Sequence, residues 1–205
     1  MSAPGIEVHH VTQVSAPRAD ALDAALAQAS PAEIIRAAVS EVGRERLALV
    51  SSFGTESAAL LKFAADVDPA IPVVFLDTGW LFEETLAYRD AMACLLGLTD
   101  VRTIHPREEA LADEDNDREL WFSDPDRCCF LRKVEPLARA LTPFSAWLNG
   151  RKRFQGGDRA TIPVVEADGE RLKFNPLANV TPQELQTLYA TSGLPPHPLA
   201  SSGFT

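Results

Sequence analysis

Two adjacent cysteines, Cys128 and Cys129, have the side chains of this sequence best suited to metal or redox chemistry. Successive residues of a helix point about 100° apart, so only one of two neighbouring thiols can face a hydrophobic core. Thiolates bind metals and iron–sulfur clusters, and the nearby Arg127, Arg132 and Lys133 would favour the thiolate form. The pair therefore predicts ligation of a metal or iron–sulfur cluster, or redox chemistry. The alternative is one buried cysteine beside an incidental one.

The third cysteine, Cys94, follows Met92 in an apolar helical stretch, and we expect it in the core. A four-iron cluster requires four thiolates, whereas this chain contains three cysteines. Three cysteines also do not make a disulfide framework. The four histidines show no spacing typical of metal ligands, so we predict no histidine metal site.

A second chemical feature is a short polar loop, which reads Ser52-Phe53-Gly54-Thr55-Glu56-Ser57. The apolar run 46–51 predicts a strand before it, and the pattern over 56–66 predicts a helix after it. Backbone N–H groups and the helix dipole favour an anion at such a junction, most often a phosphate. The loop resembles the Ser-Gly-Gly-x-Asp-Ser loop of the ATP pyrophosphatases, although Phe53 replaces a glycine and Glu56 an aspartate. The alternative is an ordinary connection between a strand and a helix.

Basic residues are concentrated in one segment of an otherwise acidic chain. Between Arg127 and Arg159 lie eight basic and two acidic residues, whereas the net charge of the whole chain is −10. This excess predicts a pocket for an anionic small molecule, because guanidinium groups match phosphate and sulfate oxygens. A solvated surface is the alternative. Lys133 lies four residues after Cys129 and therefore on the same helical face.

The elements that must position these residues alternate between strand and helix. Such alternation predicts an α/β fold with a doubly wound, mostly parallel sheet. Residues 1–30 are weakly patterned and predict a flexible N-terminal arm, whereas 31–205 form a single domain. We expect helices at 31–42, 56–66, 82–95, 127–141 (capped by Asp126) and 181–191, strands at 46–51, 71–76, 101–104 and 144–148, and a hairpin around Asp168-Gly169.

Composition excludes several classes of protein. Hydrophobic residues make up 46% and charged residues 23% of the chain, which is typical of a soluble globular protein. The negative net charge argues against a general nucleic-acid or membrane-surface partner. No apolar run approaches the roughly 20 residues of a membrane span, and the first 30 residues lack a secretory signal pattern. We therefore expect a cytoplasmic protein; its oligomeric state stays open, with a homo-oligomer as one alternative.

Several motifs occur in an order and spacing that together are highly specific. They are Ser51–Ser57; Leu76-Asp77-Thr78-Gly79 with Phe82-x-Glu84-Thr85; Cys128-Cys129-x-x-Arg132-Lys133-x-Glu135-Pro136-Leu137; Trp147-x-x-Gly150-x-Lys152-Arg153-x-Gln155 with Arg159; Lys173-x-Asn175-Pro176-Leu177-Ala178; and Pro196-His197-Pro198-Leu199 before Gly203-Phe204. Over about residues 30–205 the chain resembles the adenylyl-sulfate and phosphoadenylyl-sulfate reductase family.

This resemblance implies an adenine-nucleotide alpha-hydrolase-like (PP-loop) fold. The implied activity is thioredoxin-dependent reduction of adenosine 5′-phosphosulfate to sulfite and AMP in sulfate assimilation and cysteine biosynthesis. The adjacent cysteines resemble the iron–sulfur branch of the family, in which Cys128 and Cys129 would ligate a [4Fe–4S] cluster. The resemblance assigns substrate binding to Ser52, Phe53, Gly54, Thr55, Glu56, Ser57, Lys133, Gly150, Lys152, Arg153 and Arg159, and it places Leu76, Asp77 and Gly79 beside the adenosine.

The family pattern also has a second cysteine pair and a nucleophilic cysteine, both of which we expect beyond Thr205. The C-terminal segment is thus expected to be missing, and this 205-residue chain is expected to bind nucleotide weakly without turnover. The alternatives are a phosphoadenylyl-sulfate reductase and an ATP-pyrophosphatase or sulfate adenylyltransferase relative. A catalytically dead nucleotide-binding module becomes the favoured alternative if the natural chain ends at Thr205.

Overall fold

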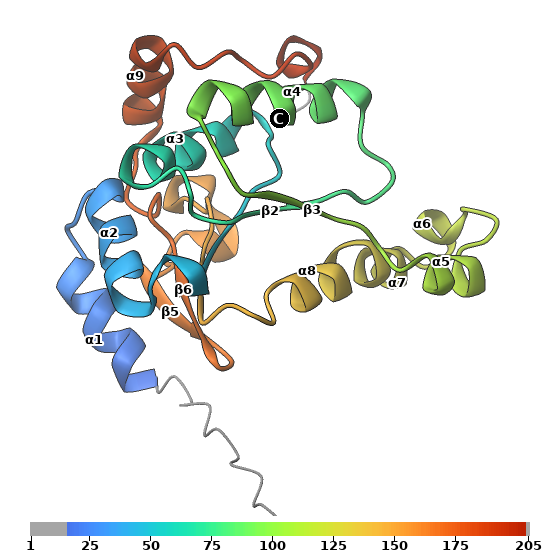
Figure 1. Ribbon diagram of the computed structural model, residues 1–205, viewed down its shortest axis with the longest axis horizontal. Helices are drawn as coiled ribbons and strands as arrows, with labels where there is room; N and C mark the ends of the chain where they lie inside the picture. The colour runs from blue at the N-terminus through green and yellow to red at the C-terminus, as the bar shows by residue number, and fades with distance from the viewer. Residues whose placement is uncertain (1–15, 204–205) are drawn as a thin grey trace, which may run out of the picture.

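A computed structural model describes residues 16–203 of the chain (Figure 1). Its centre is a six-stranded sheet with the order β3-β2-β1-β4-β6-β5. All neighbouring strands pair in parallel except β5, which pairs antiparallel with β6. The strands are β1 (Leu47–Val50), β2 (Val73–Leu76), β3 (Val101–Ile104), β4 (Ala146–Leu148), β5 (Val165–Asp168) and β6 (Arg171–Phe174). The predicted α/β fold with a doubly wound, mostly parallel sheet is confirmed.

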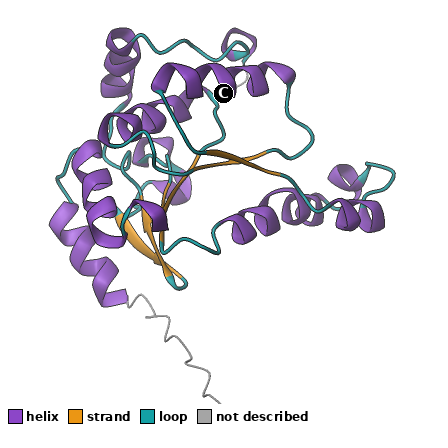
Figure 2. Cartoon of the chain, in the orientation of Figure 1, coloured by secondary structure: helices purple, strands orange, loops and turns teal. Residues whose placement is uncertain are grey.

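Helices cover both faces of the sheet, as Figure 2 shows with the strands lying between helical layers. The larger layer contains α1 (Ala16–Leu26), α2 (Pro31–Val42), α3 (Ala58–Val67), α4 (Glu83–Leu96) and α9 (Pro182–Ser192). The other face is covered by α8 (Glu135–Ala140), which packs against β2 and β3. The short helices α5 (Glu108–Glu114), α6 (Leu120–Ser123) and α7 (Pro125–Cys129) precede it. No helix in residues 16–203 is long and apolar enough to cross a bilayer.

Alternation along the strands divides the core into two clusters. Leu47 and Leu49 of β1 point into the larger cluster, whereas Ala48 points into the smaller cluster beneath α8. Such alternation follows from the two-residue period of a strand, and both faces are buried because a parallel sheet is covered on both sides. The sheet order also reverses direction between β1 and β4, which makes the carboxyl ends of these two strands the expected ligand site.

Local signals in the sequence fix several element ends. Ser30 and Thr181 each begin a helix with a capping box, in which Glu33 and Glu184 respectively accept the reciprocal hydrogen bonds. The predicted hairpin around Asp168-Gly169 is confirmed as the antiparallel pair β5–β6. These ends were predictable because each depends on residues only a few positions apart.

The N-terminal boundary of the folded domain differs from the predicted one. Helix α1 begins at Ala16 and packs against β5, and Asp23 accepts hydrogen bonds from the N–H groups of Val164 and Val165 at 2.6 and 3.1 Å. The domain therefore extends N-terminal to residue 31, because a carboxylate in the weakly patterned segment satisfies two backbone donors. The rest of the predicted arm, 1–15, lies outside the described residues.

The helix predicted over 127–141 is divided into three pieces. Asp124, not Asp126, caps α7, and a π-helical segment (Phe130–Val134) joins α7 to α8. The N–H of Glu135 donates to the Phe130 carbonyl, five residues earlier. Pro136 has no N–H for the Arg132 carbonyl, which explains why the α-helical ladder is interrupted here. Such π segments often lie at functional sites.

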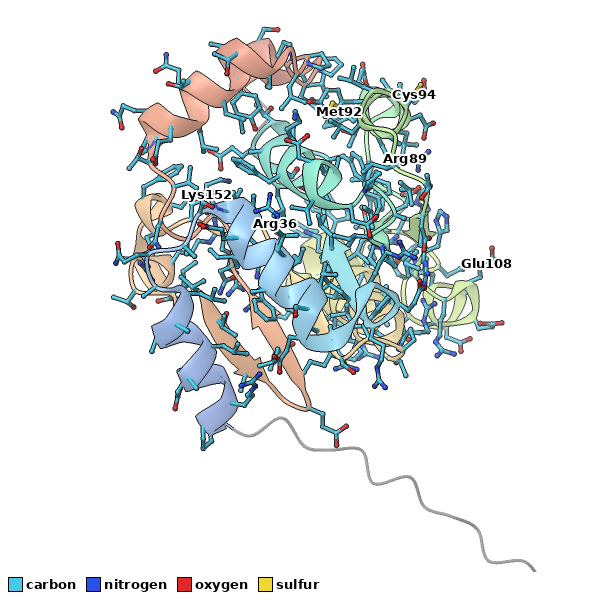
Figure 3. The ribbon with its side chains drawn as sticks, turned by 60° about the vertical axis from the view of Figure 1, so that its left-hand side comes forward. Arg36, Arg89, Met92, Cys94, Glu108 and Lys152 are labelled. Atoms are coloured by element: carbon cyan, nitrogen blue, oxygen red, sulfur yellow. The ribbon has the colours of Figure 1, made fainter. Side chains whose placement is uncertain are left out.

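The prediction that Cys94 is buried is wrong. Met92 takes the buried position on α4, whereas Cys94 is exposed (Figure 3). Residues two apart on a helix point about 200° apart, so the face that buries Met92 excludes Cys94.

Candidate functional site

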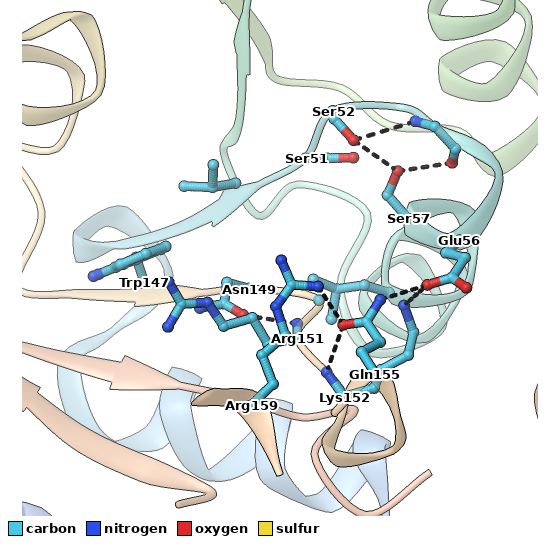
Figure 4. A pocket seen from close by; sticks show the side chains of 14 residues that line it. Ser51, Ser52, Glu56, Ser57, Trp147, Asn149, Arg151, Lys152, Gln155 and Arg159 are labelled. Carbon is cyan, nitrogen blue, oxygen red and sulfur yellow. Dashed lines mark hydrogen bonds and ion pairs between the residues drawn. The ribbon is translucent and has the colours of Figure 1, made fainter. Parts of the chain in front are cut away.

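A cavity of about 550 Å³ lies at the carboxyl ends of β1 and β4, where the sheet order reverses (Figure 4). Two loops enclose it: the polar loop after β1, and the basic loop after β4. Ligands of open α/β sheets bind at this position because the strand connections diverge there. The cavity is lined by Val50, Ser51, Ser52, Gly54, Glu56, Ser57, Leu60, Trp147, Asn149, Gly150, Arg151, Lys152, Gln155 and Arg159.

Serine hydroxyls shape the loop after β1. The Ser51 Oγ accepts the N–H of Phe53 at 3.1 Å, and the Ser57 hydroxyl donates to the Gly54 carbonyl at 2.8 Å. The Ser52 and Ser57 hydroxyls lie 3.4 Å apart at the cavity wall. A short 3-10 turn (Thr55–Ser57) then leads directly into α3, whose first N–H groups lack intrahelical acceptors. Hydroxyls and the start of a helix together favour an anion at this wall.

Phe53 contributes to this loop in an unexpected way. Its side chain is fully buried and packs edge-on against Phe75 with ring centroids 5.5 Å apart. Its φ of +51° lies in the left-handed region that favours glycine, where the ATP-pyrophosphatase loop has a glycine. Neither Phe53 nor Thr55 is among the lining residues. The ring therefore anchors the loop to the core instead of filling the cavity.

Tyr189 of α9 supports the same loop from behind. Its hydroxyl donates to the Thr55 carbonyl at 2.6 Å. Burial raises the pKa of Tyr189 to about 12. The phenol therefore stays protonated and keeps its hydrogen bond at every physiological pH.

Lys152 is the most deeply buried cation of the cavity, with only 2% of its side chain exposed. Its Nζ donates to Glu56 Oε2 at 2.9 Å, and Gln155 Nε2 donates to the same oxygen at 2.7 Å. Gln155 Oε1 in turn accepts Arg159 Nη1 at 2.8 Å. These contacts, drawn in Figure 4, join the basic loop after β4 to the polar loop after β1.

Arg151 and Arg153, on either side of Lys152, point to different surroundings. Arg151 lines the cavity, and its charge also interacts with Glu166. Arg153 does not line it: Arg153 Nε donates to the Ile162 carbonyl at 2.8 Å, and Nη1 donates to Asn179. Arg153 begins a 3-10 turn (Arg153–Gln155), and its hydrogen bonds to Ile162 and Asn179 hold its side chain away from the cavity lining.

The cavity brings together seven of the predicted substrate-binding residues, namely Ser52, Gly54, Glu56, Ser57, Gly150, Lys152 and Arg159. Sequence reasoning did not name Trp147, Asn149, Arg151 and Gln155 as site residues. The available signal was the run Arg151-Lys152-Arg153 between two motif residues, but the sequence alone does not show which of these cations face inward.

The predicted adenosine neighbours lie at the end of β2 and on the loop that follows it, outside the lining of this cavity. Asp77 Oδ1 accepts the N–H of Gly79 at 2.9 Å, and Leu76 packs in the smaller core cluster. Gly79, with a φ of +74°, lines a separate cavity of about 310 Å³ together with Asp115, Arg118 and Arg132 and three residues of the 111–116 segment.

Arg132 connects the cysteine-bearing segment to the loop after β2. Its Nη1 donates to the Thr78 carbonyl at 2.8 Å, and Nη2 pairs with Asp115, which is equally buried. Burial alone would raise the pKa of the Asp115 carboxyl, but hydrogen bonds from Arg132 and from the Leu120 N–H lower that pKa below its ordinary value. Arg132 thus holds the π-helical segment against the loop after β2.

Cys128 and Cys129 end α7, away from the lining of the 550 Å³ cavity. Cys128 is partly buried and Cys129 is exposed, and both are free thiols. Lys133 is exposed one turn later and also does not line the cavity. Across residues 16–203 no group of three or more His, Cys, Asp or Glu side chains is arranged to hold a metal ion. The two thiols therefore do not by themselves complete the donor set of a four-iron cluster.

A doubly wound sheet with a cationic cavity at its switch point defines a nucleotide-binding class of α/β protein. The family model of the phosphoadenosine phosphosulfate reductase domain matches residues 46–205. The adenosine 5′-phosphosulfate reductase of Mesorhizobium japonicum is 47% identical over 189 residues, which cover 92% of this chain and 74% of the relative. The phosphoadenosine 5′-phosphosulfate reductase of Gloeobacter violaceus is 37% identical over 182 residues, covering 85% and 73%. The chain belongs to the phosphoadenosine phosphosulfate reductase family.

Solved structures agree with this assignment. The phosphoadenylyl-sulfate reductase of Candida auris, solved as a phosphate complex, superposes with a TM-score of 0.78 at 26% identity, covering 94% of each chain. The NH₃-dependent NAD synthetase of Campylobacter jejuni superposes with a TM-score of 0.54 at 13% identity, covering 91% of this chain and 78% of the synthetase. The second similarity concerns the fold alone. The predicted PP-loop-like α/β fold is thus confirmed.

Proposed function

We propose that this chain is the nucleotide-binding domain of an adenosine 5′-phosphosulfate reductase of sulfate assimilation, an oxidoreductase that releases sulfite and AMP. The observation that carries the proposal is the 47% identity to a relative of that name over 92% of the chain. The cavity supports it, because Arg151, Lys152 and Arg159 supply positive charge where the net charge of the chain is negative. The proposal includes a cytoplasmic location, as the sequence predicts.

Different residues of the site would bind the phosphate, the sulfate and the adenosine of the nucleotide. Ser52 and Ser57, just before α3, line one wall of the cavity and suit phosphate oxygens. Lys152 and Arg159 face the opposite wall and suit the sulfate, which carries a full negative charge. We propose that Leu76, Asp77 and Gly79 lie beside the adenosine, which extends from the cavity toward the loop after β2.

The reductive step requires a thiolate that attacks the sulfate sulfur. The S–O bond to the AMP phosphate then breaks, AMP leaves with the electron pair, and an S-sulfocysteine forms. A dithiol protein, for which we propose thioredoxin, attacks the cysteine sulfur; sulfite leaves with the S–S electron pair, and the second thiol resolves the mixed disulfide. None of the three cysteines lines the cavity. We therefore propose that the attacking thiolate comes from a cysteine that is not among the lining residues of the cavity.

We propose Cys128 and Cys129 as two of four ligands of a [4Fe–4S] cluster, with Lys133 and Arg153 assisting substrate binding from outside the cavity. The support is the adjacent pair at the end of α7, next to a π-helical segment. The cluster would supply a local electrostatic influence. Anaerobic iron and acid-labile sulfide analysis tests this: Cys128→Ser should abolish iron retention, whereas Cys94→Ser should leave it unchanged. Equal iron content in both variants would contradict the ligand assignment.

Calorimetry with adenosine 5′-phosphosulfate and ATP tests the proposed function. We expect tighter binding of adenosine 5′-phosphosulfate, and no sulfite formation from this chain with thioredoxin, because its cysteines lie outside the cavity. A clear preference for ATP would favour an ATP-pyrophosphatase relative. Relatives named as phosphoadenosine 5′-phosphosulfate reductases at 35–37% identity make the 3′-phosphorylated nucleotide the second candidate substrate.

A further inference from the structure

Three neighbouring strands of the sheet, β2, β1 and β4, end in turns of the same kind. The first residue after each strand accepts, through a side-chain oxygen, the N–H of the residue two positions later. The pairs are Ser51 with Phe53 at 3.1 Å, Asp77 with Gly79 at 2.9 Å, and Asn149 with Arg151 at 2.8 Å. Serine, aspartate and asparagine favour such turns because their short side chains reach the nearby backbone. The recurrence at three adjacent strand ends calls for a common explanation.

The three turns leave the same backbone group unused. The N–H of each first residue continues the ladder by donating to a carbonyl of the neighbouring strand at 2.9–3.1 Å. The N–H of each third residue is bound by the turn. Only the middle residues remain, and within the described part of the chain the N–H groups of Ser52, Thr78 and Gly150 donate to no acceptor. Because neighbouring strands lie about 4.8 Å apart, these N–H groups form a row along the carboxyl edge of the sheet.

The turn after β4 bears directly on the 550 Å³ cavity. Gly150 lines this cavity, and because glycine has no side chain, its backbone forms that part of the wall. Asn149 is 7% exposed, and its bond to the Arg151 N–H (Figure 4) is the one hydrogen bond that its side chain makes within residues 16–203, since Nδ2 has no partner there. The Asn149 side chain therefore acts through this turn.

We infer that Asn149 is a positioning residue for the nucleotide, because its turn leaves the Gly150 N–H free to donate to an oxygen of that ligand. This inference rests on the proposed function and adds a residue that the sequence motifs did not assign. Backbone N–H groups bind anionic oxygens strongly, and an N–H without an acceptor in the folded chain is suited to a ligand oxygen. The other N–H groups of the row, those of Ser52 and Thr78, lie along the path proposed for the nucleotide from the cavity toward the loop after β2.

Calorimetric titration with adenosine 5′-phosphosulfate tests the role of the turn. Asn149→Ala should bind this nucleotide about five- to tenfold more weakly, because without the turn the Gly150 N–H loses its alignment with the ligand oxygen. Asn149→Ser should restore the affinity to within about twofold of wild type, because a serine hydroxyl can accept the same N–H, as Ser51 does after β1. If Asn149→Ala does not fold, Asn149→Leu, which has a similar volume and no acceptor, should show the same loss.

The matched control is Asp68→Ala. Asp68 Oδ1 accepts the N–H of Ala70 at 2.9 Å in a turn of the same kind, but this turn precedes β2 and lies outside the cavity lining. The control should lower the midpoint of thermal unfolding and leave the affinity unchanged. Equal affinities of the serine variant and the variant without an acceptor, or an equal loss in the control, would overturn the role of Asn149 while the wild type still binds the nucleotide. A wild type that does not bind adenosine 5′-phosphosulfate would overturn the proposed function and this inference together.

Discussion

Lys152 offers the sharpest test of how the cavity binds an anion. Lys152→Met removes the charge of a side chain that is 2% exposed and keeps most of its volume. A hydrogen bond to a charged group contributes about 1.5–3 kcal/mol. The freed Glu56 would add repulsion of about 1 kcal/mol for unit charges 8 Å apart at an effective dielectric constant near 40. The combined loss of about 2.5–4 kcal/mol predicts binding about 60- to 700-fold weaker.

Isothermal titration with adenosine 5′-phosphosulfate measures this loss directly. The double variant Lys152→Met/Glu56→Gln should recover about fivefold, because it removes the unpaired carboxylate together with the lysine. Lys62→Met is the matched control, because Lys62 pairs with Asp66 on α3 and lies outside the cavity lining. The affinity of this variant for adenosine 5′-phosphosulfate should stay within twofold of the wild-type value. Wild-type affinity in Lys152→Met, or a double variant weaker than the single one, would refute the reasoning.

Three further predictions concern the framework of the site. In urea unfolding, Phe53→Ala should lower the free energy of unfolding by about 3–5 kcal/mol, because it removes a fully buried ring. Phe53→Gly should be about 1 kcal/mol more stable than Phe53→Ala, because glycine adopts the positive φ freely. An alanine variant more stable than the glycine variant would contradict this. Asp115→Asn should lower the free energy of unfolding by about 3–5 kcal/mol at pH 7, because it leaves the buried charge of Arg132 uncompensated. Because the pKa of Asp115 is lowered in the folded state, its contribution is present above the ordinary carboxyl pKa and lost as pH falls through the folded pKa. Unfolding measured between pH 7 and pH 3 should therefore show a smaller decrease in the variant than in the wild type, and parallel curves would exclude this role. Tyr189→Phe should lower the free energy of unfolding by about 1–2 kcal/mol, because it removes the hydroxyl that donates to the Thr55 carbonyl. In an ultraviolet titration, the variant should lack the phenol that titrates near pH 12. An unchanged unfolding midpoint would argue against the contact.

Local patterns determined much of the architecture before any tertiary contact is considered. The capping residues Ser30 and Thr181, the Asp168-Gly169 turn and the strand 101–104 were all predicted and are confirmed. Each depends on residues close in sequence, whose backbone preferences and hydrogen bonds are largely independent of the rest of the chain. The alternation of strands and helices then predicted the doubly wound sheet, because parallel strands need crossover connections.

The tertiary structure decided which residues meet. Glu56 and Lys152 are 96 positions apart, and their ion pair exists because β1 and β4 are adjacent in the sheet. Arg151 and Arg153 look equivalent in the sequence, yet only Arg151 lines the cavity, since Ile162 and Asn179 accept hydrogen bonds from Arg153. Sequence motifs thus determined the kinds of side chain present at the site. The direction of each side chain depended on distant backbone groups that compete for the same donors, and only the folded chain brings those groups together.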